Sequence, residues 1–278
     1  MHPRALTSTR SAFSLVFVVA AAAVLGVSSA QAQLFAFDSN RTIYVLDINT
    51  GARVAVGTVS ANAGTVAGVA YDRANNIVYL TSSNNDSVYT LNLQTGTATL
   101  IGAYGDAAIV MHGLEYDDST GILYGVSSHN NGLYNISLTN GAASLIGTSG
   151  LTSFTNLGYN SDTNVMYATN SGSDSFYTIN RATGAASLIG PLNGPTNPHG
   201  LAYNRDNGKL YLIDSNTDGL YTIDTATGAA TLIGSPGAGN YLGLVYISQV
   251  PEPGSLMLLG LGGVGLVALQ RWQRRRRA

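Results

Sequence analysis

The 278-residue sequence contains no cysteine and one tryptophan, and only 10% of its residues are charged. Without cysteine the chain cannot form a disulfide or use a thiol nucleophile. Its stability must therefore come from a packed core, which a chain of this length can bury.

The few charges are unevenly distributed. Residues 1–33 and 250–278 contain seven of the thirteen Lys and Arg residues but one of the fifteen Asp and Glu residues. Residues 34–249 therefore have six basic and fourteen acidic residues, a net charge of −8, and Lys209 is the one lysine. A surface of this sign repels phosphate backbones, so we expect no nucleic-acid partner.

Tyrosine, in contrast, is frequent and regularly spaced. Fourteen of the sixteen tyrosines fall on three series with steps of 43 to 45 residues. The series are Tyr71, Tyr116, Tyr159, Tyr203 and Tyr246; Tyr79, Tyr124, Tyr167 and Tyr211; and Tyr44, Tyr89, Tyr134, Tyr177 and Tyr221. Such a period, carried by short apolar strands and glycine turns, is typical of β-repeat folds whose units pack against their neighbours. We expect the tyrosines to pack inside these units rather than to bind ligands.

Each repeat is predicted to contain four short strands. In the third full repeat they cover residues 157–159, 165–169, 175–179 and 186–189. Aromatic and β-branched residues form these runs, and Gly, Asn, Asp and Thr separate them. A Thr-Gly or Asn-Gly pair precedes the fourth strand, where glycine allows the positive φ of a tight hairpin. Each unit is therefore an antiparallel meander.

The two ends of the repeat array indicate a closed ring. Residues 34–57 contain the last three strands of a unit, and residues 241–248 supply a first strand alone. Joining them in one sheet removes two exposed edges. We predict an all-β fold over residues 33–249: a five-bladed β-propeller of four-stranded antiparallel blades, closed by the C-terminal strand, which completes the first blade. The period also fits kelch and WD40 arrays, although no Trp-Asp dipeptide occurs.

Residues 1–32 have the features of a secretory signal peptide. Arg4 and Arg10 precede an apolar run from Phe13 to Leu25, and Ala30-Gln31-Ala32 suits cleavage by signal peptidase before Gln33. The run is shorter than the ~20 apolar residues of a membrane span. We expect a signal helix that is removed on export.

Residues 250–278 form a tail with three successive features. They are Pro251-Glu252-Pro253, an uncharged segment from Leu256 to Leu269, and a basic end with Arg274, Arg275, Arg276 and Arg277. The tail resembles the PEP-CTERM sorting signal of Gram-negative, exopolysaccharide-producing bacteria. This resemblance implies that an exosortase-type membrane protease cuts near Pro-Glu-Pro and that the mature protein reaches the cell surface or the medium.

The basic end also predicts how the tail lies before processing. Positive charge after an apolar helix stays in the cytoplasm, so the predicted C-terminal transmembrane or sorting helix would anchor the chain in the inner membrane with the propeller outside. A permanent C-terminal anchor is the alternative to cleavage.

Candidate binding groups are expected on one face of the ring. The links between first and second strands and between third and fourth strands are short and alike, whereas the other links vary and share the opposite face. His112 and His199 each precede the glycine of a first strand, which predicts a pair near the channel mouth. With Asp214 they are the candidate ligand or metal residues. Half-buried histidines bonded to loop backbone are the alternative, and oxygen-rich links on this face suit calcium or sugar hydroxyls without a known calcium motif.

Catalytic groups are sparse in the predicted ring. Residues 33–249 contain one glutamate, Glu115, whereas a glycosidase needs two placed carboxylates, for which Asp106 and Asp214 are the remaining partners. No Gly-x-Ser-x-Gly motif occurs. We expect a noncatalytic exported propeller of the extracellular matrix, without cofactor, that binds exopolysaccharide or surface proteins. A lactonase- or lyase-like enzyme using His112 and His199 and an ice-binding protein are the two alternatives.

Overall fold

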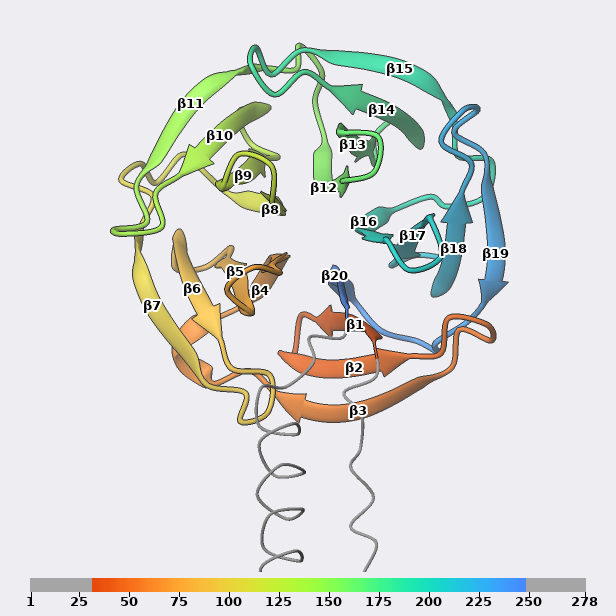
Figure 1. Cartoon of the computed structure of the whole chain (residues 1–278), viewed down its shortest axis with the longest axis horizontal. Helices are drawn as coiled ribbons and strands as arrows, with labels where there is room; N and C mark the ends of the chain where they lie inside the picture. Colours follow the sequence, from red (N-terminus) through yellow and green to blue (C-terminus); the bar gives the residue numbers. More distant parts are fainter. Residues whose placement is uncertain (1–31, 249–278) are drawn as a thin grey trace, which may run out of the picture. The chain divides into compact units, whose positions relative to one another are not determined.

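Figure 1 shows five blades arranged in a ring around a central axis in the computed structural model, which describes residues 32–248. Each blade is a four-stranded antiparallel sheet, so the prediction of an all-β, five-bladed propeller is confirmed. Between β3 and β4 lies one 3-10 turn, η1 (Ala61–Ala63). The predicted signal and sorting helices fall outside the described residues. Within residues 32–248 the structure has no helix with the length and apolar character of a membrane span.

The strands of each blade follow one another from the channel outward. Blade 1 contains β20 (Tyr241–Ile247), β1 (Gln33–Asp38), β2 (Thr42–Leu46) and β3 (Arg53–Thr58). Blade 2 contains β4 (Val66–Asp72), β5 (Ile77–Ser82), β6 (Ser87–Leu91) and β7 (Ala98–Ala103). Blade 3 contains β8 (Met111–Asp117), β9 (Ile122–Ser127), β10 (Gly132–Ile136) and β11 (Ala143–Thr148). Blade 4 contains β12 (Phe154–Asn160), β13 (Val165–Asn170), β14 (Ser175–Ile179) and β15 (Ala186–Pro191). Blade 5 contains β16 (Pro198–Asn204), β17 (Lys209–Asp214), β18 (Gly219–Ile223) and β19 (Ala230–Gly234).

Blade 1 closes the ring by joining the two ends of the array. β20 pairs with β1 in an antiparallel ladder from Gln33–Ile247 to Asp38–Tyr241, as the sequence predicts. Arg53 of β3 supports this closure, since its guanidinium donates to the Tyr241 hydroxyl and lies 4.6 Å from the centre of the Tyr44 ring. The closing blade is therefore held by backbone pairing and by one cation between two aromatic rings.

The inner strands are longer than the sequence suggests. β12 begins at Phe154, three residues before its predicted start at Leu157. The reason is an irregularity in the ladder: Phe154 pairs with Asn170 but Asn156 pairs with Thr169. A bulge of this kind keeps the strand in the sheet while it breaks the alternation that marks a strand in sequence.

The hydrophobic core lies between neighbouring blades. One cluster joins Phe37 of β1 to Leu80 of β5, both fully buried, and another stacks Tyr79 on Tyr116 with ring centres 6.0 Å apart. Full burial of a side chain such as Phe37 or Leu80 contributes about 1.5–3 kcal/mol. All tyrosines of the three series are buried except Tyr44, Tyr203 and Tyr246, which are half-buried. The expectation that they pack in the core is confirmed.

Glycines let the inner strands approach one another closely around the channel. A Cβ atom added at Gly113 of β8 would lie 2.7 Å from the Cα of Asn156 on β12, and one at Gly200 of β16 would lie 2.6 Å from the Cβ of Leu244 on β20. Contacts this short do not occur between real side chains, so these positions exclude any larger residue. Four of the five first strands have glycine at this position and blade 4 has Asn156, so four close approaches of this kind contribute to the narrow ring, at Gly68, Gly113, Gly200 and Gly243.

Gly113→Ala should therefore destabilise the propeller by about 1–3 kcal/mol, because the added methyl group overlaps the neighbouring strand. Gly57→Ala is a matched control, since a Cβ there meets only the Ile43 Cδ1 atom, at 3.6 Å. The free energy of unfolding in urea measures both changes. Equal effects of the two substitutions would contradict the close-approach argument.

Candidate functional site

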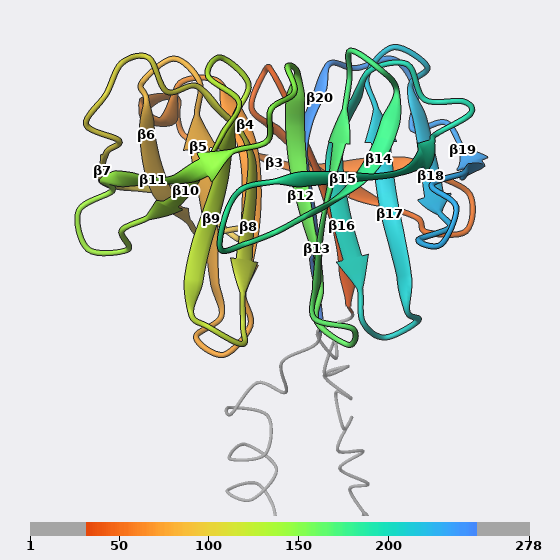
Figure 2. The same ribbon diagram turned by 90° about the horizontal axis from the view of Figure 1, so that it is seen from above.

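The channel opens on two faces that differ in their links. The links after β4, β8, β12 and β16 lie together at the lower end of the ring in Figure 2. We call this end, with the links between third and fourth strands, the uniform face, and the opposite end the variable face. β1 begins and β20 ends at the uniform face, with Gln33 opposite Ile247. Both ends of the described chain are therefore neighbours on the uniform face.

The mouth on the variable face holds the two predicted histidines. His112 on β8 and His199 on β16 come together edge to face, with ring centres 6.4 Å apart. They border a small cavity of about 10 Å³ beside Asn156 of the intervening β12. A cavity of this size holds about one water molecule.

The two imidazoles have different partners. The Nδ1 atom of His112 lies 2.7 Å from the Ser128 hydroxyl, whereas the buried Nδ1 of His199 has no hydrogen-bond partner among the described residues. Burial, and then the neighbouring His129, lowers the pKa of His112. Burial, and then His112, lowers the pKa of His199 to about 4. Both rings are therefore neutral at pH 7, with a nitrogen lone pair available to a ligand.

Asp214 lies at the end of β17 and supports the loops next to His199. Its side chain is fully buried. Oδ2 accepts the backbone N–H groups of Thr196 at 2.8 Å and Asn197 at 2.6 Å, while Oδ1 accepts those of Asn216 at 3.0 Å and Thr217 at 2.8 Å. Both oxygens of the Asp214 carboxylate are therefore used in hydrogen bonds to the backbone of two links, residues 196–197 and residues 216–217. Within residues 32–248 no group of three or more His, Asp or Glu side chains is arranged to hold a metal ion.

The mouth on the uniform face has a larger cavity beside Glu115. This cavity of about 40 Å³ is lined by Glu115 together with the tyrosines that end the inner strands, and by Arg73, Asp118, Arg205 and Ser248. Glu115 Oε1 accepts the N–H of Tyr116 at 3.0 Å, and Oε2 accepts that of Tyr159 at 3.1 Å. Burial raises the pKa of Glu115 to about 8 despite these two bonds, which lower it.

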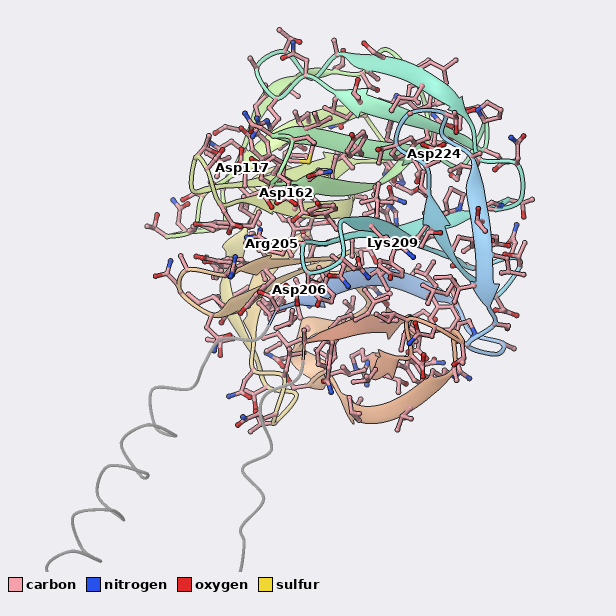
Figure 3. The ribbon with its side chains drawn as sticks, turned by 45° about the vertical axis from the view of Figure 1, so that its right-hand side comes forward. Asp117, Asp162, Arg205, Asp206, Lys209 and Asp224 are labelled. Carbon is pink, nitrogen blue, oxygen red and sulfur yellow. The ribbon has the colours of Figure 1, made fainter. Side chains whose placement is uncertain are left out.

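Charged and phenolic groups form the rim of this second mouth, as Figure 3 shows for Asp162, Arg205 and Asp206. Arg205 of blade 5 forms an ion pair with Asp118 of blade 3. The Tyr203 hydroxyl donates to Asp162 at 2.7 Å, and the Tyr246 hydroxyl donates to Asp206 at 2.6 Å. The two tyrosine bonds reach the preceding blade, and the ion pair joins blade 5 to blade 3, so the rim connects blades around the opening.

Sequence reasoning identified the histidine pair and missed the cavity at Glu115. The signal was present, because Glu115 occupies a position that holds Ala70, Gly158, Ala202 or Val245 in the other inner strands. A single carboxylate at a position where the other four blades have small apolar residues indicates that blade 3 has a different chemistry there. The predicted processing and membrane residues, Pro251-Glu252-Pro253 and Arg274 to Arg277, lie outside the described residues.

Comparison with known families and proteins identifies the tail. Residues 249–277 match the family described as the PEP-CTERM protein-sorting motif. The motif implies export and membrane-anchored sorting, and exosortase recognises it. The chain thus carries a PEP-CTERM sorting motif after a five-bladed β-propeller region. Comparison with curated proteins gave no match.

Solved structures resemble the propeller at low sequence identity. A chain of a nidogen/laminin complex has a TM-score of 0.57 and 14% identity, covering 79% of this chain and 100% of that one. A structural genomics protein of unknown function from Bacteroides thetaiotaomicron has a TM-score of 0.55 and 17% identity, covering 78% and 66%. Virginiamycin B lyase from Staphylococcus aureus has a TM-score of 0.47 and 14% identity, covering 71% and 64%. At these identities the first two similarities show the fold alone.

The raised pKa of Glu115 predicts how stability depends on pH. Between its ordinary value of 4.5 and about 8, the folded chain keeps a proton that the unfolded chain has lost. The free energy of unfolding should therefore fall as pH rises through this window, by roughly 2–4 kcal/mol from this group. The Glu115→Gln side chain cannot ionise, so the free energy of unfolding of this variant should fall less with rising pH than that of the wild type. Urea unfolding between pH 5 and about 9 measures the difference. Parallel profiles for the two proteins would contradict the assignment.

Proposed function

We propose that this protein is a noncatalytic binding propeller displayed at the cell surface or released into the extracellular matrix, where its variable face contacts exopolysaccharide or surface proteins. The observation that carries the proposal is the position of the chain ends. Gln33 and Ile247 are paired on the uniform face, and the sorting motif follows directly after Ser248. Attachment through the tail therefore leaves the links of the variable face free for a partner.

The chemistry of those links supports a hydroxyl-rich partner. The exposed residues in the links between second and third strands are Asn40, Asn84, Asn85, His129, Gly172, Ser173, Asn216 and Thr217. Most carry uncharged amide or hydroxyl groups, which both donate and accept hydrogen bonds. The propeller holds these links on rigid strands, as binding loops generally require. The neutral pair His112 and His199 lies at the centre of the same face and is part of the proposed contact surface.

Removing amides from the variable face should weaken polysaccharide binding. An Asn84→Ala, Asn216→Ala double variant removes exposed amides from two blades, and we expect at least a tenfold loss of affinity because each lost hydrogen bond costs about 1 kcal/mol. The matched control, Ala182→Ser with Ala226→Ser, changes exposed positions on the uniform face. Binding to exopolysaccharide from the producing strain, measured by cosedimentation, compares the two. Equal losses in both would place the contact elsewhere.

The sorting step has its own test. Replacing Pro251-Glu252-Pro253 by three alanines should leave the chain in the cell envelope with its tail attached, because the proposed protease would lose its recognition sequence. Fractionation and the mass of the mature protein follow this outcome. Release at the wild-type rate and with the wild-type mass would show that processing does not depend on these residues.

An enzyme of the lactonase or lyase class is the second proposal, and the unpartnered Nδ1 of His199 favours it. In this proposal His112 and His199 supply two nitrogen ligands and water or substrate completes the coordination of a metal. The His112→Ala, His199→Ala variant should then lose bound metal, which elemental analysis of the purified protein measures. If the purified wild-type protein contains no metal and still binds polysaccharide, the enzyme proposal is wrong and the binding proposal remains.

A further inference from the structure

The inner strands leave unpaired backbone groups along the channel. β4, β8, β12, β16 and β20 are each the end strand of their sheet, so each is paired along one edge only. The free edges lie around the channel in Figure 1. Backbone N–H and C=O groups that are removed from water need a partner. The Glu115 side chain accepts hydrogen bonds from two of these groups, the N–H groups of Tyr116 and Tyr159. It therefore connects the free edges of blades 3 and 4.

The Glu115 carboxylate retains acceptor capacity after these two bonds. Each oxygen has two lone-pair positions, and each accepts one N–H group in the structure. The cavity of about 40 Å³ adjoins Glu115, so the remaining positions have space beside them. The space is sufficient for a few water molecules or a small ion.

The cations nearby do not neutralise this carboxylate by direct contact. Arg205 lines the cavity, but its ion pair is with Asp118 at the rim. Arg73 also lines the cavity, and its side chain is exposed to solvent. The burial that raises the pKa of Glu115 therefore acts on a carboxyl group without an ion-pair partner. Glu115 is half-buried by its accessible surface, and a partly desolvated carboxylate without an ion-pair partner is stabilised by a cation that reaches it.

We propose that the cavity beside Glu115 binds a small inorganic cation that prefers oxygen ligands. The Glu115 carboxylate is the charged ligand, and water and free carbonyl groups of the inner strands are the neutral ones. Hard cations such as Na⁺, K⁺ and Ca²⁺ accept this mixture of carboxylate, carbonyl and water oxygens. The site is separate from the variable face and does not depend on the proposed binding function.

The cation would stabilise the ring where blades 3 and 4 meet. Binding to the folded chain alone raises its stability by mass action. We therefore expect the midpoint of thermal unfolding of the full-length protein to rise by about 3 °C when a small cation is present at roughly ten times its dissociation constant. The measurement compares NaCl, KCl and CaCl₂ with tetramethylammonium chloride at equal ionic strength and at a pH of about 9, because the pKa of Glu115 is raised to about 8 and the carboxylate must be ionised to bind a cation. The large organic cation does not fit the cavity, and the salt that gives the rise identifies the ion.

Glu115→Ala is the decisive variant, because alanine already occupies this position in Ala70 and Ala202. The variant should fold and show the same midpoint in every salt. Asp106→Asn, at an exposed link of the variable face, removes one acidic charge elsewhere and should keep the wild-type rise. If Glu115→Ala fails to fold, Glu115→Gln with isothermal titration calorimetry provides the comparison, and its affinity for the cation should fall at least tenfold.

Two outcomes would overturn the proposal. One is a wild-type protein whose unfolding midpoint and titration heats are the same in all four salts. The other is a rise that persists at full size in Glu115→Ala, which would assign the cation effect to the general surface charge.

Discussion

The pairing of β20 with β1 is the interaction on which the rest of the structure depends. In an open array, the first and last sheets would each expose an unpaired edge, and the inner strands could spread apart. The ladder from Gln33–Ile247 to Asp38–Tyr241 removes both edges and fixes the circumference. Once the circumference is fixed, five blades can meet only if their inner strands approach closely, which is why glycine stands at Gly113 and Gly200.

The narrow channel gives its two mouths different chemistry. At the variable face the repeat places His112 and His199 close enough to interact, and Asp214 holds the loops beside them. At the uniform face one blade replaces a small apolar residue with Glu115, which accepts one N–H group from its own strand and one from blade 4, and tyrosines of all five blades line the cavity beside it. Small departures from the repeat, rather than the repeat itself, therefore create the candidate sites.

The fold could be predicted from sequence because its determinants are local and repeated. The tyrosine series and the glycine turns occur in every unit, and the incomplete units at the two ends are complementary. The first residues of the inner strands were harder to predict from sequence, because the bulge near Asn156 depends on the partner strand β13. The histidine pair followed from the repeat position. The cavity at Glu115 did not, because it depends on which backbone groups of β12 face the carboxylate, and spacing along one strand contains no such information.

The order of the strands along the chain has a consequence for folding during export. β1 is made early, whereas its partner β20 is among the last segments of the propeller to be made. Contacts between such distant residues form slowly, because the intervening chain must first be ordered. Until then β1 has an open edge that another copy's β20 could occupy. Because the sorting motif at residues 249–277 directly follows β20, the ring can close only after nearly all of the chain before that motif has been made.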